Sequence, residues 1–273
     1  MGNKFMRWQK IACSLGVALR PGMVRSMWIG VWLLSVIIAP SSSFAFPLSD
    51  RVREADDYYL GRQDLANVAH GLDLLRKDVA QDPKDYEAWW RISKFIYYQA
   101  RHAASSDKMK LLDSGVDAAK KAVALQPSRV EGHYWLGANY NLTAEVRGYW
   151  RGLWFVESIR REMEAATRLD PDYEQAGGLR TLAQIDFRAP FFLGGDKRRS
   201  IRLLKECLDR YPENSRAMLY LSDSDMALGF RDDARNTLEQ ILNLCPDPQY
   251  GPELVENQEE ARARMSKYFP TPQ

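Results

Sequence analysis

Five prolines at nearly regular spacing constrain the fold of this chain more than any other feature. The spacings between successive prolines are 44, 44, 41 and 34 residues, and each proline closes a short joint between segments with helical periodicity. These prolines are Pro83, Pro127, Pro171, Pro212 and Pro246. Such a period is typical of stacked helical hairpins, because a single hairpin cannot bury its apolar face without neighbours. The sequence therefore predicts an all-α protein, a right-handed solenoid of about five hairpins.

The helices of this solenoid can be placed between the prolines. The expected pairs of segments are 48–61 with 65–81, 86–103 with 109–125, a helix after Pro127 with 152–169 beyond a loop near 143–151, the segments on either side of 188–196, and the two helices within 214–244. We expect Ser128 to cap the third hairpin and Asp196 to cap the second helix of the fourth. A last helix at about 252–268 would cover the exposed end of the stack. With no segment alternating as a strand does, we predict eleven helices in a single domain, 46–273.

The N-terminus has the pattern of an export signal. Residues 1–26 hold five basic and no acidic residues, the apolar run 27–39 follows, and Ser43 and Ala45 supply small side chains for cleavage. We expect a signal peptide, 1–45, cleaved after Ala45 to leave a periplasmic chain without a membrane span. An N-terminal membrane anchor is the alternative, although an apolar run of 13 residues is shorter than the roughly 20 that cross a bilayer as a helix. Translation from either Met1 or Met23 fits this pattern.

The charge balance argues against a nucleic-acid partner. The whole chain has a formal charge of +2, but without the five basic residues of the leader 33 basic residues face 36 acidic ones. Binding to nucleic acid depends on neutralising phosphates with a basic surface. We therefore exclude nucleic-acid binding.

Two cysteines, Cys207 and Cys245, remain after the expected cleavage. Because an exported protein meets an oxidising compartment, a disulfide is an alternative to two buried thiols. The two residues stand 38 positions apart, which places them diagonally on neighbouring hairpins. Their Cα atoms would then lie beyond the roughly 7 Å that a disulfide allows. We favour two thiols and leave their oxidation open.

No motif points to catalysis or to a bound metal. The histidines His70, His102 and His133 are not spaced as a helical metal pair. The run 194–197, Gly-Gly-Asp-Lys, precedes a helix but lacks the spacing of a phosphate-binding loop, so we interpret it as helix punctuation with a cap. Nucleophile-elbow, zinc-protease and Cys-x-x-Cys motifs are also missing from the sequence. We predict a protein that is not an enzyme and needs no metal or cofactor.

The fifth hairpin resembles a tetratricopeptide repeat. The positions that carry this resemblance are Leu221, Ser222, Ala234, Leu238 and Pro246, and the pattern returns in the third hairpin at Tyr134-Trp135-Leu136-Gly137 with Tyr140. The third hairpin has about ten additional residues before its closing proline. We attribute them to helices lengthened on both sides of the turn.

The order of further motifs over 48–246 resembles the periplasmic T-component family of TRAP-type solute transporters. The motifs are ADDYY at 55–59, DYEAWW at 85–90, YWLG at 134–137, GGL at 177–179 and APFFLGGD at 189–196. The resemblance implies a protein-interaction module that docks onto a periplasmic solute-binding protein. The alternative is a carrier that holds an organic acid or a lipid-like molecule. An enclosed, mainly apolar cavity would favour the carrier, and an open groove the module.

Hairpins of this kind place their first helices on the concave side of the solenoid. Residues of the first helices that lie outside the seams are therefore our candidates for the partner-binding face, namely Trp90, Lys94, Tyr97, Tyr134, Asn141, Arg180, Gln184, Arg216 and Asp223. Tryptophan, tyrosine and arginine dominate interface hot spots because they bury much surface at modest entropic cost. As an alternative, Trp90 and Tyr134 fill the clefts between hairpins.

A second aromatic cluster lies outside the regular seams. It contains Tyr149, Trp150, Trp154 and Phe155. We favour core packing by lengthened helices as its role. Exposure would instead make it a second candidate patch, for a partner or for a homo-oligomer.

Overall fold

The computed structural model describes residues 48–247 and 249–270. The expected signal peptide and its cleavage site after Ala45 lie outside these residues. In the described part of the chain all regular structure is helical, and no strand is present. The all-α prediction is confirmed.

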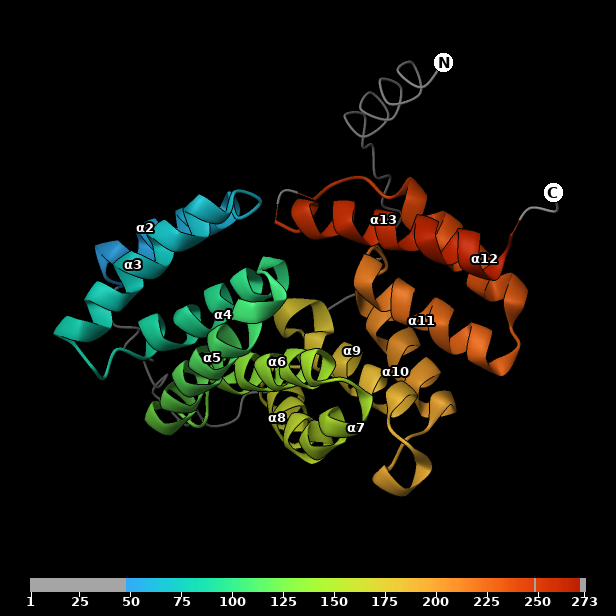
Figure 1. Cartoon of the computed structure of the whole chain (residues 1–273), viewed down its shortest axis with the longest axis horizontal. Coiled ribbons are helices and arrows are strands. Elements are labelled where there is room, and N and C mark those ends of the chain that lie inside the picture. Colours follow the sequence, from blue (N-terminus) through green and yellow to red (C-terminus); the bar gives the residue numbers. More distant parts are fainter. Residues whose placement is uncertain (1–47, 248, 271–273) are drawn as a thin grey trace, which may run out of the picture. The chain divides into compact units, whose positions relative to one another are not determined.

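Five helical hairpins and a final helix follow one another along the chain (Figure 1). The hairpins are α2 (Asp50–Leu60) with α3 (Leu65–Gln81), α4 (Tyr86–His102) with α5 (Ser105–Leu125), α6 (Val130–Arg147) with α8 (Val156–Leu169), α9 (Tyr173–Arg188) with α10 (Lys197–Arg210), and α11 (Ser215–Leu228) with α12 (Arg231–Asn243); α13 (Gly251–Tyr268) follows. Among the described residues these make the eleven predicted helices. The four-residue α7 (Tyr149–Gly152) and the 3₁₀ turns η1 (Leu153–Phe155) and η2 (Phe191–Leu193) were not anticipated.

The five prolines of the sequence pattern all lie in the joints between helices. Asp196 caps α10 as predicted, accepting hydrogen bonds from the backbone N–H groups of Arg198 and Arg199. The prediction for Ser128 is wrong, because α6 has Arg129 at its N-cap position and no side-chain cap. The guanidinium of Arg129 pairs instead with Glu87 at 2.7 Å, which ties this joint to the preceding hairpin.

The third hairpin departs most from the expected outline. The helix α6 continues through Thr143, whose hydroxyl donates to the carbonyl of Asn139 one turn earlier at 2.8 Å. It ends only at Gly148, a residue with φ of 77° that a glycine adopts without strain. The additional residues of this hairpin therefore form α7 and η1 as well as a longer α6.

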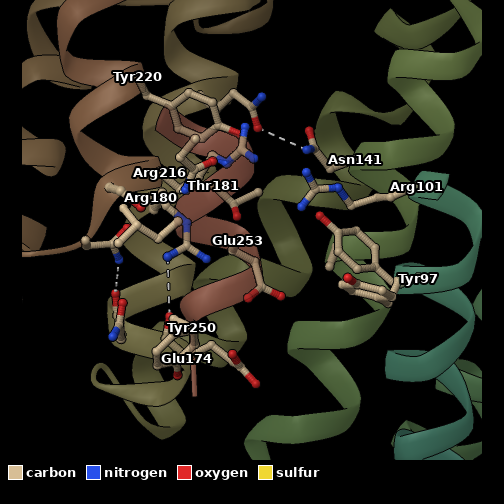
Figure 2. Close-up of a pocket in the computed structure, with 18 of the residues that line it drawn as sticks. Tyr97, Arg101, Asn141, Glu174, Arg180, Thr181, Arg216, Tyr220, Tyr250 and Glu253 are labelled. Carbon is tan, nitrogen blue, oxygen red and sulfur yellow. Dashed lines mark hydrogen bonds between the residues drawn. The ribbon is translucent and has the colours of Figure 1, made fainter. Parts of the chain in front are cut away.

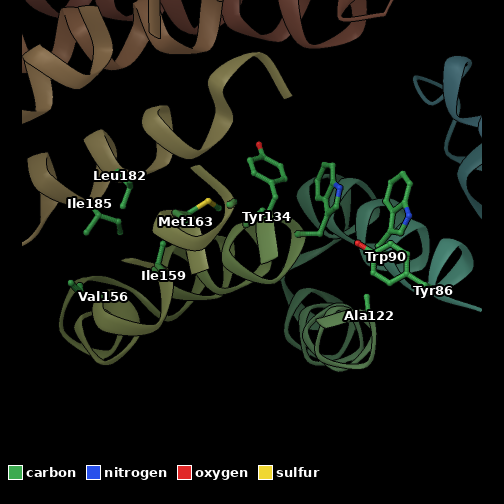
Figure 3. Packing of buried hydrophobic residues seen from close by; sticks show 12 residues of the cluster. Tyr86, Trp90, Ala122, Tyr134, Val156, Ile159, Met163, Leu182 and Ile185 are labelled. Atoms are coloured by element: carbon green, nitrogen blue, oxygen red, sulfur yellow. The ribbon is translucent and has the colours of Figure 1, made fainter. Parts of the chain in front are cut away.

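The seams between helices hold the apolar core. In the cluster of Figure 3, residues from α4, α5, α6, α8 and α9 pack together, among them Ile159 and Met163 with no exposed surface. Gly137 lets α6 and α8 approach, because a Cβ atom there would lie 2.8 Å from the terminal carbon of Met163. In the next seam Leu204 and Cys207 are fully buried. Cys207 is a free thiol, so it forms no disulfide with Cys245, and burial raises its pKa.

Candidate functional site

A cavity of ≈ 370 Å³ lies on the inner side of the solenoid (Figure 2). Its walls come from the first helices of the hairpins, α2, α4, α6, α9 and α11, and from α13. Six of the nine predicted concave residues line it: Tyr97, Tyr134, Asn141, Arg180, Gln184 and Arg216. Helix periodicity thus locates most of this inner surface.

The other three predicted residues do not line the cavity, and each has a partner in the described chain. Trp90 is 9% exposed and donates its indole N–H to Glu87 at 2.9 Å, so it fills a seam between hairpins. Lys94 forms an ion pair with Glu174 at 3.2 Å. The carboxylate of Asp223 accepts two hydrogen bonds from Arg264, at 2.9 and 3.0 Å.

Tyr134 both packs in the core between hairpins and lines the cavity. Its ring is 5% exposed and meets Trp135 and Tyr173 edge to face. Its hydroxyl accepts a hydrogen bond from Nη2 of Arg180 at 3.1 Å. Burial raises the pKa of Tyr134, although the nearby Arg180 acts in the opposite direction. The hydroxyl therefore stays protonated and orients the arginine.

The helix α13 closes the inner side against the first hairpin, a contact that sequence reasoning missed. Arg62, only 2% exposed, lies in the turn after α2 and binds both carboxylate oxygens of Glu253 on α13, with Nε to Oε1 at 2.8 Å. Its guanidinium also lies over the ring of Tyr59, 4.8 Å from the centroid. Burial alone would lower the pKa of Arg62, but the hydrogen bond and charge of Glu253 raise it. We call this pair the closing latch.

A second contact supports the closing latch. Arg101 at the end of α4 pairs with Glu256 of α13 at 2.8 Å, and Nε2 of His102 lies 2.8 Å from the other carboxylate oxygen. These residues are 154 or more positions apart in the sequence. The cavity is therefore bounded on one side by the last helix of the described chain.

Two arginines of the cavity wall have unused hydrogen-bonding capacity. Arg180 donates to the Tyr134 hydroxyl and, at 3.4 Å, to the backbone carbonyl of Glu174, but within the described residues it pairs with no carboxylate. Arg216 pairs with Glu260 at 2.7 Å through Nη1, while its Nη2 is buried without a partner. Figure 2 shows both arginines on one wall, beside Tyr220.

Asn257 on α13 adds an unsatisfied acceptor to the same cavity. It is 1% exposed, and its amide nitrogen donates to the Ser215 hydroxyl at 2.7 Å. Its Oδ1 has no partner within the described chain. Buried polar atoms normally find a partner, so an exception needs an explanation such as a bound water or ion. Of the three such side-chain atoms found among the described residues, two belong to this cavity.

Carboxylates balance most of the remaining charge of the cavity. Glu174, Glu145 and Glu253 pair with Lys94, Arg188 and Arg62, and Glu260 is shared by Arg216 and Arg264. Arg180 is thus the lining arginine whose charge no carboxylate of the described residues offsets at close range. A guanidinium stays charged in proteins, so this side chain favours an anion beside it.

The start of α9 forms a strained part of the cavity wall. Glu174, Gln175 and Ala176 have φ angles of 50°, 55° and 55°. This left-handed region costs a non-glycine residue about 1–2 kcal/mol. The carbonyls of the turn are in use, since that of Glu174 accepts from Arg180 and that of Gln175 accepts from Asn214 at 3.0 Å. Such strain persists where surrounding contacts hold it, which is common at functional sites.

The second aromatic cluster is exposed, so our expectation of core packing is wrong. Tyr149, Trp150 and Trp154 are 54%, 77% and 86% exposed. Only Phe155 packs partly, against Tyr140 with ring centroids 5.9 Å apart. The reason is that α7 and η1 are an insertion beyond the seam of α6 and α8, where no neighbouring helix covers them.

The described residues offer little for metal chemistry. No group of three or more His, Cys, Asp or Glu side chains in this part of the chain is arranged to hold a metal ion. Of the described helices, none has both the length and the apolar character that crossing a membrane requires. The cavity can bind by hydrogen bonds and charge, through arginine, tyrosine and asparagine side chains.

Two family models match parts of the chain. Residues 51–178 match the family described as regulator of microtubule dynamics protein 1-3, and residues 195–251 match the tetratricopeptide repeat. No curated protein matches the chain. The second match covers the fifth hairpin, where the sequence resembles that repeat.

Solved structures show the same architecture. A thermophilic tetratricopeptide-repeat protein of Thermus thermophilus, TTC0263, is 18% identical with a TM-score of 0.55, and the match covers 81% of this chain and 100% of that one. PilW, a type IV pilus biogenesis factor, is 14% identical with a TM-score of 0.53, covering 83% of this chain and 97% of that one. The described residues therefore have the fold of tetratricopeptide-repeat proteins, with a match to the repeat family itself at 195–251.

Proposed function

We propose that this chain is a non-catalytic, exported interaction module whose inner cavity receives an anionic group of its partner. One observation carries the proposal: Arg180 lines the cavity without a carboxylate partner, next to a buried and unsatisfied Nη2 of Arg216. Arginine binds carboxylates through parallel, charge-assisted hydrogen bonds that are shorter and stronger than neutral ones. A carboxylate placed here would satisfy both side chains.

The cavity lining also indicates which other polar groups the anionic ligand should carry. Oδ1 of Asn257 needs a donor, which a hydroxyl of a hydroxy acid or an N–H of a peptide supplies. Burial raises the pKa values of Tyr220 and Tyr250, so both hydroxyls remain protonated and available as donors. The cavity therefore suits an anion that carries further polar groups.

For a protein partner, we propose a periplasmic solute-binding protein, with this chain as the T-component of a TRAP-type system. The order of motifs along 48–246 supports that role, and the leader pattern of 1–45 supports the periplasm. The partner would insert an acidic segment between α4, α9 and α13. A homo-oligomer is an additional assembly that this proposal allows.

A small-molecule carrier is the second candidate, and the closing latch favours it. Because Arg62 and Glu253 join the first hairpin to α13, the inner side is bounded rather than an open groove. Its ≈ 370 Å³ lies within the roughly 300–1,000 Å³ of small-ligand pockets. The many charged and hydroxyl groups of the lining suit an organic acid better than a lipid-like molecule.

The test compares what remains bound to the exported protein. Wild type and Arg180→Gln/Arg216→Gln are purified from the periplasm, with and without cross-linking, and examined by native mass spectrometry. Arg210→Gln, an exposed arginine of α10, is the matched control. Glu260 keeps Arg264 as a partner in the double variant, so we expect it to fold.

The interaction module is supported if a protein cross-links to wild type and to the control but not to the double variant. A bound organic acid with the same dependence supports the carrier. If the double variant melts like wild type and retains everything that wild type binds, the cavity is not the binding site and the proposal fails.

A further inference from the structure

Two neighbouring turns of the solenoid carry large apolar side chains that nothing in the described chain covers. The first turn contains α7 and η1 of the third hairpin, and the second contains η2 of the fourth. In Figure 1 both α7 and the turn between α9 and α10 lie toward the lower edge of the view. We call their exposed apolar residues the aromatic edge: Tyr149, Trp150, Trp154, Phe191, Phe192 and Leu193.

The exposure of the aromatic edge is unusual for side chains of this size. Trp154 and Phe191 are 86% and 91% exposed, and Trp150 and Phe192 are both 77% exposed. A soluble protein rarely leaves several neighbouring aromatic rings in water, because each forfeits the free energy of burial. Contiguous apolar patches of this kind mark sites of contact with a protein or a membrane.

Internal contacts hold the two turns at the same end of their hairpins. Asp186 near the end of α9 is 1% exposed and pairs with Arg160 of α8 at 2.9 Å and also with Arg199 of α10. The Nη2 atom of Arg160 reaches the carbonyl of Gly194, in the second turn, at 3.4 Å. The aromatic edge therefore comprises two turns at the same end of neighbouring hairpins, and the buried Asp186 links the helices that follow them, α8 and α10.

Positive charge surrounds this surface. Arg151 belongs to the first turn, and Lys197, Arg198 and Arg202 follow the second on α10; all four are exposed. None of the four pairs with a carboxylate of the described residues. Arg160 and Arg199 share the single carboxylate of Asp186, so this group also carries more positive than negative charge.

We propose that the aromatic edge docks this protein on the surface of an anionic membrane. Tryptophan and phenylalanine insert at the boundary between head groups and acyl chains, and exposed arginine and lysine beside them attract anionic head groups. A second copy of this chain fits the same surface poorly. An interface between two copies places like patches together, and here it would oppose the same unpaired cations.

The experiment measures flotation of the exported protein with lipid vesicles. One set of vesicles is phosphatidylcholine alone, and the other contains phosphatidylglycerol as well. The tip variant is Trp150→Ala/Trp154→Ala/Phe191→Ala/Phe192→Ala, and the charge variant is Arg151→Gln/Lys197→Gln/Arg198→Gln. The matched charge control is Lys77→Gln/Lys110→Gln/Lys120→Gln, three exposed lysines of α3 and α5.

We expect wild type and the control to float with the anionic vesicles, and binding to weaken with salt. Each neutralised charge should lower the partition coefficient about five-fold, so the charge variant should lose about 100-fold. The tip variant should lose at least about ten-fold, because the inserted apolar area is gone. Melting curves should match wild type, since the replaced side chains contribute little to the core.

Several results would overturn the proposal. The proposal fails if wild type does not bind anionic vesicles at low salt. It also fails if the tip variant floats as well as wild type. A wild-type dimer in sedimentation velocity that the tip variant loses, without vesicle binding, would make the surface a self-association site. An acidic protein that co-purifies only with wild type, again without vesicle binding, would make it a protein-docking site.

Discussion

The cavity and the aromatic edge use the same residue types in opposite ways. In the cavity, Tyr134 is 5% exposed and hydrogen-bonded by Arg180, and most arginines face a carboxylate. At the aromatic edge, Trp154 is 86% exposed and Arg151 has no carboxylate partner among the described residues. Aromatic and arginine content alone therefore does not identify a binding surface. What distinguishes the two regions is whether neighbouring helices cover the side chains.

The closing latch is the contact whose removal should affect the cavity side most. Arg62→Ala leaves Glu253 without its buried partner, and breaking one member of a buried pair costs about 3–5 kcal/mol. Urea melts of wild type and variant measure the loss. Arg53→Ala removes an exposed pair with Asp50 and should change stability by less than about 1 kcal/mol. Equal effects from the two substitutions would show that the latch does not hold α13 in place.

A pair of truncations compares the two regions directly. Leu204→Ala empties a fully buried position and should cost about 2–5 kcal/mol. Trp154→Ala removes a larger side chain but should change stability by less than about 0.5 kcal/mol, because the ring is in water. Thermal and urea unfolding of both variants give the comparison. A large loss for Trp154→Ala would mean that the aromatic edge is packed in the folded protein.

Gly137→Leu tests the close approach of α6 and α8, on which the cavity wall rests. A Cβ atom alone would lie 2.8 Å from Met163, so the larger side chain should overpack the seam at about 1–3 kcal/mol. Gly148, whose Cβ would meet nothing within 4 Å, is unsuitable as a control because its φ is 77°. Ala227→Leu on an exposed face of α11 is the better control, and its urea midpoint should stay near that of wild type. A Gly137→Leu variant as stable as the control would contradict this packing.

The smallest expected effect concerns pH. The hydrogen bond to Glu162, 2.7 Å from Nδ1, raises the pKa of His133 above 6.5 in the folded chain. The contribution of this pair to the stability of the fold is therefore complete below pH 6.5 and is lost as the pH rises through the raised pKa of His133. Partly exposed pairs of this kind contribute about 1 kcal/mol or less. His133→Gln should flatten that decline in melts across neutral pH. An unchanged slope would refute the assignment.

Local signals in the sequence were sufficient for the helices and for most of the inner surface. Prolines cannot continue a helix, so Pro83 and Pro127 mark joints whatever the tertiary structure. Helix periodicity placed Tyr97 and Arg216 on the concave side. It did not separate them from Trp90, because whether a ring fills a seam or faces the cavity depends on a small rotation of the helix.

The closing latch and the aromatic edge required the three-dimensional structure. Arg62 and Glu253 are 191 residues apart, and they meet only because small rotations between successive hairpins accumulate. The aromatic residues of α7 and η1 lie in a short insertion. Its sequence has too few residues for a periodic pattern that would indicate which side is covered by neighbouring helices. Sequence reasoning thus anticipated core packing where the structure shows exposure.

Site-specific photo-cross-linking tests the central claim, that the cavity rather than the aromatic edge holds the partner. A benzoylphenylalanine is introduced at Tyr220 in the cavity wall or at Trp150 on the aromatic edge, and the protein is irradiated in the cells that produce it. We expect the Tyr220 position to capture a discrete protein or organic acid, and Arg180→Gln in the same chain to abolish that capture, while the Trp150 position captures lipid. A discrete partner captured from Trp150, with none captured from Tyr220, would contradict it.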